Sequence, residues 1–312
     1  MITKSNFRGV TWIDMESPSP DDVAKIRKEF GIHSIVAQEM SVPSLRPKVD
    51  VYSNAAYIVL YFPVYEYRKP GFSDDSSTGA QEVDFIIGKD FIVTVHYEHI
   101  DQFYDFTKLF EVGELMDSGK VREKVDAGFV FFNIMKGLYR SIEDNLESIN
   151  ANLKDIESQI FAGEERNMVQ RISNVNRSLL DFRWALKNHE DLLNSLESDA
   201  GELFDERFSY FIRSLFNEYY KIWNVIEGNK EIVSDLRTTN DSLLTTKTNE
   251  VMKIFTILAF FTFPLSLVSS LFSMNTQYTP LVHSPYGFWI ILLGMAFVTL
   301  LMFFYFKRQK WF

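Results

Sequence analysis

The chain has 312 residues, of which 46% are hydrophobic and 24% charged, and its formal net charge is −10. Without the four cations that follow residue 250, the charge on residues 1–250 is −14, and so acidic a region repels phosphates and disfavours nucleic-acid binding. The absence of cysteine excludes disulfides and thiolate metal sites. The N-terminus has no apolar run of signal-peptide length, so we expect this acidic region to stay in the cytoplasm.

The first 120 residues alternate between helical and strand patterns. Pro20 to Phe30 is a predicted helix, with Ser19 as its N-cap and two acids in its first turn. Three apolar runs rich in β-branched residues predict strands: 51–67, 83–87 and 91–95. The sequence Gly88-Lys89-Asp90 predicts a hairpin turn between the last two, and the Pro-, Gly- and Ser-rich residues 69–80 predict a loop. We therefore expect an α/β domain over residues 1–120.

From about residue 121 the hydrophobic period becomes helical. Apolar residues recur at steps of three and four, as in the seam of packed helices: Leu146, Ile149, Leu153, Ile156 and Ile160. A break at 161–163 precedes a second helix to about Ser198, and a third helix begins near Glu202. With only Gly228 as a weak breaker, the third helix is predicted to reach Phe272, about 100 Å away at about 1.5 Å per residue. Residues 121–250 are thus a predicted helical bundle and stalk.

Two uncharged stretches follow. Ile254–Phe272 has 19 residues and Tyr286–Phe306 has 21, against the roughly 20 that a spanning helix needs. We predict transmembrane helices at 251–272 and 286–306, joined by a loop at 273–285. Cations precede the first span and fill the tail at 307–312, so the positive-inside rule predicts that both ends are cytoplasmic. A simple two-helix anchor for a cytosolic domain has the same pattern.

The residues around the first span resemble the CorA metal-ion transporter family. The segment 247–256 is similar to that family's stalk-to-membrane signature, Pro264 follows at the expected distance, and Ser273-Met274-Asn275 occupies the place of its Gly-Met-Asn motif. Similarities at 46–62 and 88–96 extend the resemblance over nearly the whole chain. The resemblance implies an α+β membrane protein of the inner membrane, assembled as a funnel-shaped homopentamer around a pore, with Mg2+ as the cargo and no organic cofactor.

Ser273, Met274 and Asn275 are the expected selectivity filter. Mg2+ gives up its waters reluctantly, so a ring of Asn275 side chains would hold the hydrated ion through hydrogen bonds. Counting helical turns inward from Asn275 predicts the residues that line the pore: Asn249, Met252, Phe255, Ala259, Phe263, Ser266 and Ser270. The four from Met252 to Phe263 form a predicted apolar constriction that gates by dewetting. The chain has no phosphate-binding P-loop sequence, so ATP is not the expected energy source for transport. The membrane potential suffices, because 100 mV gives two charges that move inward about 4.6 kcal/mol.

The filter and the outer loop depart from the family pattern. Ser273 stands where the family usually has glycine, which permits a special backbone conformation or a close approach. The outer loop has no acid at 279–281, where the family typically has one. Both departures concern the entrance of the predicted pore.

The stalk departs as well. Ser214 and Asn217 occupy positions where the family has carboxylates, one of which contributes to a divalent-ion sensor between subunits. A hard cation there loses its main ligands, so Asp84 and Glu218 are the candidate ligands of a regulatory Mg2+.

Other interpretations stay open. The same pore would suit Zn2+, Co2+ or Ni2+, and a relative that lost transport would serve as a membrane scaffold or sensor. The short run His96-Tyr97-Glu98-His99 suggests a transition-metal site, although alternate residues at a strand end point apart. No nucleophile–base or metal-hydrolase pattern is present, so we do not expect an enzyme.

Overall fold

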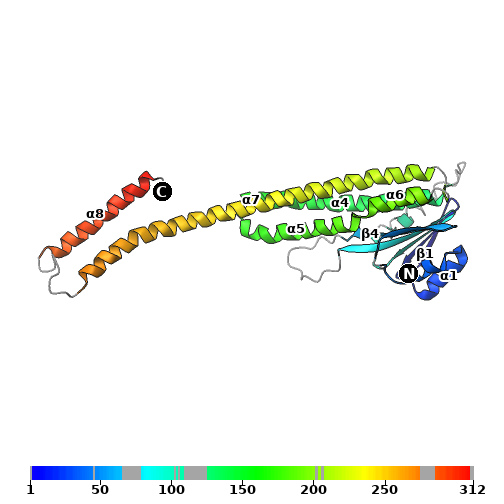
Figure 1. Ribbon diagram of the computed structural model, residues 1–312, viewed down its shortest axis with the longest axis horizontal. Helices are drawn as coiled ribbons and strands as arrows, with labels where there is room; N and C mark the ends of the chain where they lie inside the picture. Colours follow the sequence, from blue (N-terminus) through cyan, green and yellow to red (C-terminus); the bar gives the residue numbers. More distant parts are fainter. Residues whose placement is uncertain are drawn as a thin grey trace. The chain divides into compact units, whose positions relative to one another are not determined.

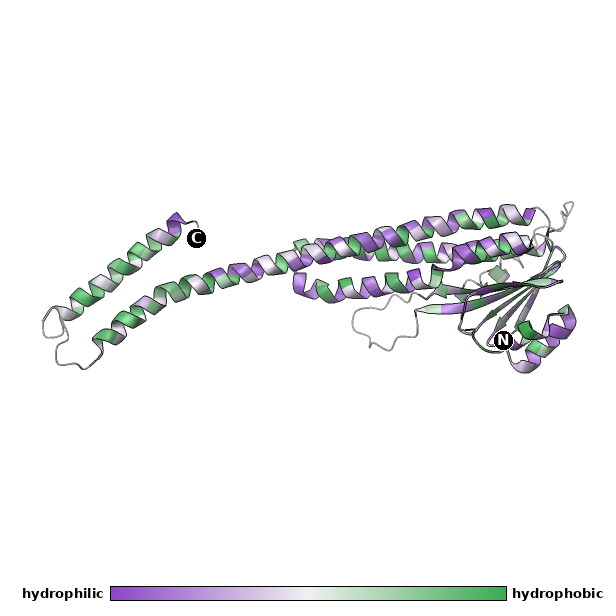
Figure 2. Ribbon diagram, viewed as in Figure 1, coloured by the Kyte–Doolittle hydropathy of each residue, from purple (hydrophilic) through white to green (hydrophobic). Residues whose placement is uncertain are grey.

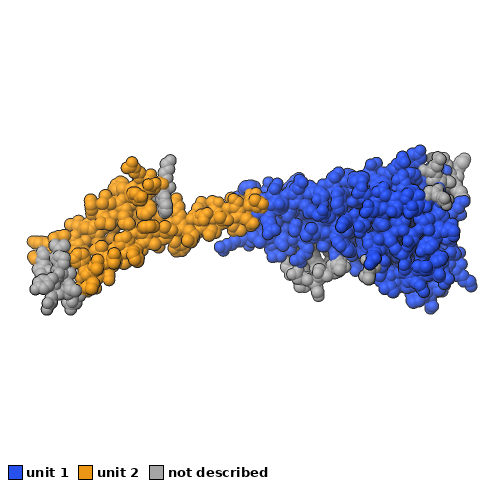
Figure 3. Space-filling view, in the orientation of Figure 1, with its two compact units in different colours: residues 1–237 blue, residues 238–312 orange. Residues whose placement is uncertain are grey.

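The computed structural model describes most of the chain, in these ranges: 2–44, 46–64, 79–101, 103–104, 106–108, 125–200, 203–204, 207–274 and 285–309. The chain divides into two compact units, Met1–Arg237 and Thr238–Phe312 (Figure 3). The boundary predicted at residue 120 lies outside the described residues.

A six-stranded sheet organises the N-terminal part of the first unit. Its strands are β1 (Ile2–Phe7), β2 (Val10–Glu16), β3 (Lys48–Val51), β4 (Ala55–Pro63), β5 (Ala80–Gly88) and β6 (Phe91–His96). Their order is β1-β2-β6-β5-β4-β3, and β2 pairs with β6 in parallel while the other neighbours are antiparallel. The predicted hairpin at Gly88 is confirmed, because β5 and β6 pair from Val83↔His96 to Ile87↔Ile92.

Two details of the strand predictions were wrong. The single strand expected at 51–67 is divided, since β3 ends at Val51 and β4 begins at Ala55. Ala80, the last residue of the expected loop, is already the first residue of β5 and pairs with Pro63. Residues 69–78 of the expected loop lie outside the described residues, and Gly79 directly precedes β5.

Helices cover both faces of the sheet (Figure 1). On one face lie α1 (Pro20–Phe30) and α2 (Ser34–Glu39), whose apolar side chains share a core with alternate residues of β4 and β6. The start of α1 is as predicted, because the Ser19 hydroxyl accepts from the Asp22 amide in a capping box. On the other face Phe85 meets Phe131 of α4 (Ala127–Phe161), with ring centroids 5.3 Å apart.

Three further helices pack beside α4 in the first unit. They are α5 (Glu165–Leu186), α6 (His189–Asp199) and the first part of α7 (Arg207–Phe272). All five apolar residues of the predicted seam in α4 are buried. The predicted break is confirmed, because α4 ends at Phe161 and Gly163 takes a positive φ of 99°.

The second helix was predicted as one piece to about Ser198, and this was wrong. It is divided at Lys187 and Asn188, and α6 starts at His189, which is completely enclosed. The His189 Nε2–H donates to the Tyr61 carbonyl at 2.8 Å, so its Nδ1 accepts from the Tyr139 hydroxyl at 2.9 Å. These bonds tie the start of α6 to β4 and α4, and they require the neutral imidazole.

This histidine gives the fold a defined pH dependence. Burial lowers the pKa of His189 to about 4, although the Tyr61 carbonyl favours the charged ring. Between the ordinary pKa of about 6.5 and this value, the unfolded chain binds a proton that the folded chain does not. We therefore expect the unfolding free energy to fall by on the order of 3 kcal/mol as the pH drops from 7 to 4.

Tryptophan fluorescence of the full chain in detergent, unfolded by denaturant at each pH, measures this loss. The variant His189→Gln keeps polar groups at the site without a titrating ring, so it should be less stable at pH 7 but lose less stability on acidification. Equal pH dependence in the two proteins would show that other groups cause the acid sensitivity.

The long third helix is confirmed as α7, which runs for 66 residues without interruption at Gly228 or Pro264. Its predicted start near Glu202 lies outside the described residues, and the structure has its first helical residue at Arg207. The second predicted span corresponds to α8 (Gly287–Arg308), two residues longer at its end than the uncharged stretch. The last part of α7 and nearly all of α8 are apolar (Figure 2).

Candidate functional site

The residues expected to line the pore share one face of α7. At about 100° per residue, the seven positions from Asn249 to Ser270 fall within an arc of roughly 120°. All seven are exposed in the single chain, and the large ones, Met252, Phe255 and Phe263, are 59%, 62% and 74% exposed. Exposed phenylalanine at this density needs cover from lipid or from another chain, so this face is available as an interface.

The chemistry changes along that face. Asn249 lies at one end, Ser266 and Ser270 lie at the other, and the four residues between them are apolar. The face carries no charged side chain, so a cation beside it would meet only amide, hydroxyl and backbone oxygen. The apolar middle offers nothing to a hydrated ion, which is the property of a constriction that opens and closes by wetting.

The filter motif lies at the end of α7. The Ser273 amide donates to the carbonyls of Ser269 and Ser270, at 3.0 and 3.2 Å, so the last turn of the helix closes on this residue. Among the described non-glycine residues, only Arg8 and Ser17 have positive φ. Ser273 therefore adopts no conformation that demands glycine. Asn275 lies outside the described residues.

The proposed regulatory acids lie in different surroundings. Asp84 is fully buried in β5, where its Oδ2 accepts from the Tyr57 hydroxyl at 2.9 Å and its Oδ1 has no hydrogen-bond partner in the described part of the chain. Burial, and then the neighbouring Glu82 carboxylate, raise the pKa of Asp84 well above its usual range. Glu218 lies on α7 with its Oε1 4.0 Å from the Lys136 ammonium.

No group of three or more His, Asp or Glu that would suit a metal ion occurs among the described residues. A regulatory cation at Asp84 or Glu218 would thus need further ligands of other kinds, such as water or backbone oxygen, or ligands from another chain. The partners of Asp84 were not predicted, although Glu82 and Asp84 are acids at alternate positions of an apolar strand and so share a face.

The two histidines of the short His-Tyr-Glu-His run do not share a site. His96 ends β6, and its Nε2 lies 3.3 Å from the Asp14 carboxylate. His99 is exposed and contacts Glu16 and Asp101 instead. Burial disfavours the charged ring of His96, but the Asp14 carboxylate outweighs this and raises the pKa. The two rings have separate partners, as expected of a strand end.

The chain thus has an α/β unit and a helical bundle, followed by two helices that are long and apolar enough to cross a membrane, which is the organisation of an integral membrane protein. The family model for the CorA-like Mg2+ transporter protein matches residues 7–308. The chain belongs to that family, and the resemblance read from the sequence is confirmed at this level.

Relatives and solved structures agree along almost the full length. The chain is 28% identical over 304 residues to the cobalt/magnesium transport protein CorA of Thermotoga maritima, covering 96% of this chain and 83% of that protein. The complete structure of the CorA magnesium transporter from Methanocaldococcus jannaschii superposes with a TM-score of 0.82 at 20% identity, covering 97% and 92% of the two chains. The full-length CmaX protein gives a TM-score of 0.72 at 18% identity, covering 97% of this chain and 89% of that one.

Proposed function

We propose that the chain is one subunit of a homopentameric channel that passes hydrated Mg2+ across the inner (plasma) membrane, driven by the membrane potential. The observation that carries this proposal is the exposed face of α7, which is polar at both ends, apolar in the middle and uncharged throughout. Two spans cannot enclose a pathway, so several copies must place this face around a common axis. Both ends of the chain would then lie in the cytoplasm, with the funnel of α/β units and stalks beneath the pore.

In this assembly Ser273, Met274 and Asn275 form the filter at the outer mouth. The ring of Asn275 amides binds the water shell of the ion, while the constriction from Met252 to Phe263 controls its passage. Because Ser273 needs no special φ, the cost of a β-carbon there would come from close approach between copies. The T. maritima relative is named for cobalt as well as magnesium, so Co2+ is the competing ion to test first, followed by Zn2+ and Ni2+.

We expect cytosolic Mg2+ to bind weakly at the two candidate regulatory acids, Asp84 and Glu218. Asp84 is enclosed and its environment favours the protonated form, so a proton competes with any cation for its oxygens. Glu218 has a lysine beside it that a cation must displace. We therefore propose that the closing response to Mg2+ is shallow in this protein.

Uptake into liposomes that contain the purified chain tests transport. An inside-negative potential of 100 mV should drive Mg2+ accumulation, since two charges gain about 4.6 kcal/mol. After an ionophore has collapsed the potential, the Mg2+ concentration inside should rise no higher than the concentration outside. An indicator dye inside the vesicles measures the ion, with Co2+ compared at equal concentration. Vesicles that take up no divalent cation would favour the scaffold or sensor function instead.

A further inference from the structure

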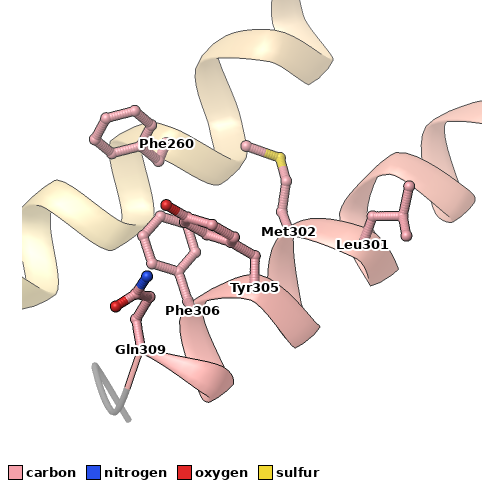
Figure 4. Close-up of a pocket in the computed structure, with 6 residues that line it drawn as sticks. All are labelled: Phe260, Leu301, Met302, Tyr305, Phe306 and Gln309. Carbon is pink, nitrogen blue, oxygen red and sulfur yellow. The ribbon is translucent and has the colours of Figure 1, made fainter.

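A cavity of about 810 Å3 lies between the two spanning helices, inside the second unit. Phe260 of α7 lines it from one side; from the other it is lined by four residues of α8 and by the residue that caps this helix: Leu301, Met302, Tyr305, Phe306 and Gln309 (Figure 4). Phe306 is the buried residue of this lining, and its ring lies 5.9 Å from that of Phe260 and 5.8 Å from that of Phe261, centroid to centroid. The volume falls within the range of roughly 300–1,000 Å3 that holds small ligands.

The lining has an apolar body and a polar edge. Five of its six residues present aromatic, aliphatic or thioether surface, whereas Gln309 adds an amide and Tyr305 a hydroxyl. Tyr305 lies in the last turn of α8 and Gln309 caps the helix, so both polar groups lie at the end of the span that carries the basic residues. An occupant must therefore be apolar along most of its length and able to accept hydrogen bonds at one end.

Cations flank this polar edge on both helices. Arg308 lies seven residues after Leu301 and three after Tyr305, so it shares their face of α8. Lys253 lies seven residues before Phe260, on the same face of α7 and about 10 Å nearer the basic end. Lys307 points to the opposite side of α8 from the cavity, by the same helical count. No acidic side chain follows Glu250, which lies three residues before Lys253 on α7, so no side-chain carboxylate within the hairpin balances Arg308.

We propose that this cavity binds an anionic phospholipid, with one acyl chain against Phe260, Met302 and Phe306. The headgroup phosphate lies between Arg308 and Lys253 and accepts from the Tyr305 hydroxyl and the Gln309 amide. A lipid without a cation of its own in the headgroup leaves both protein cations free to neutralise the phosphate, whereas the choline of a zwitterionic lipid competes with them. Basic pockets between spanning helices on the cytoplasmic side commonly bind anionic headgroups.

A second copy of the chain is the rival occupant, and charge argues against it. Residues 254–306 of another hairpin would bring no charged side chain, and its basic ends would bring further lysine and arginine. The positive charge of Arg308 and Lys253 would then stay unbalanced or increase. The lipid site needs only the membrane location of the hairpin, so it stands or fails independently of ion transport.

Photo-crosslinking distinguishes the two occupants without altering the cations. A benzophenone amino acid is placed at Leu301, and, as the control, at Leu300, which is equally exposed (55% each) but faces away from the cavity at the same depth. The full-length protein is irradiated in vesicles of equal parts phosphatidylglycerol and phosphatidylcholine. We expect phosphatidylglycerol adducts to exceed phosphatidylcholine adducts at least fivefold at Leu301 and to be about equal to them at Leu300. Equal adducts at Leu301, or crosslinks there to a second chain, overturn the proposal.

Charge variants then test the headgroup site. Arg308→Gln and Lys253→Gln should each reduce the lipid preference measured at Leu301 by at least half. Lys307→Gln removes the same charge from the opposite face and should leave the preference unchanged. An equal loss with Lys307→Gln would mean that the basic tail attracts anionic lipid without a defined site, and this too overturns the proposal.

Discussion

Replacement of Asn275 by alanine is expected to reduce Mg2+ uptake by liposomes at least a hundredfold while the protein still assembles. In the proposed filter each amide makes a hydrogen bond to the water shell of the ion, and alanine makes none. A loss of about 1 kcal/mol per subunit, repeated around the ring, exceeds the roughly 3 kcal/mol that a hundredfold change requires. Native mass spectrometry of both proteins should give five copies, because Asn275 supplies polar contacts to the ion and little packing.

The matched control for this variant is Asn275→Asp, which keeps the size of the side chain and adds a charge. A carboxylate ring binds the cation more tightly and releases it more slowly, so this variant should bind Mg2+ and pass it at a reduced rate. Unchanged uptake in Asn275→Ala would place the filter elsewhere on the chain. Loss of the pentamer in that variant would show that residue 275 serves assembly.

The elements that the sequence predicted correctly depend on local chemistry. Ser19 and Asp22 supply reciprocal caps within four residues, and Gly88 lies at a turn between two strands that pair directly. The seam of α4 repeats every three or four residues over four turns, so its buried face is fixed by period alone. The two spans follow from length and the absence of charge, and TM helices tolerate a proline such as Pro264.

The elements that the sequence did not predict depend on contacts between distant segments. The break at Lys187 and Asn188 contains neither glycine nor proline, and it is explained only by the bonds of His189 to α4 and β4. Likewise, Asp84 is an ordinary acid in the sequence, and its enclosure depends on the helices that cover that face of the sheet. The pore face stays a prediction because, in the proposed pentamer, its neighbours would belong to other copies of the chain.

The double variant Ser214→Asp and Asn217→Asp is expected to close at a cytosolic Mg2+ concentration at least tenfold below that of the unaltered protein. Ser214 and Asn217 lie one turn apart on α7, the first partly buried and the second exposed, so two carboxylates there would present oxygens on one side of the helix. A hard cation between subunits is held by carboxylate oxygen, and the present pair offers a hydroxyl and an amide. A tenfold shift requires about 1.4 kcal/mol, which two added anionic ligands readily supply.

Lys221 would oppose Mg2+ binding in the double variant, because it lies one turn beyond Asn217 and would attract the new carboxylate there. It already pairs with Glu143 on α4, with the ammonium 2.5 Å from the carboxylate oxygen, so a new carboxylate would have to compete with Glu143 for it. The matched control is Ser214→Asn, which adds the bulk of an aspartate without its charge and should leave closure unchanged. Currents in planar bilayers at varied Mg2+ on the cytoplasmic side measure the response of all three proteins. If the unaltered protein already closes steeply and the double variant closes at the same concentration, the missing carboxylates have no regulatory consequence, and other acids of the first unit must bind the regulating ion.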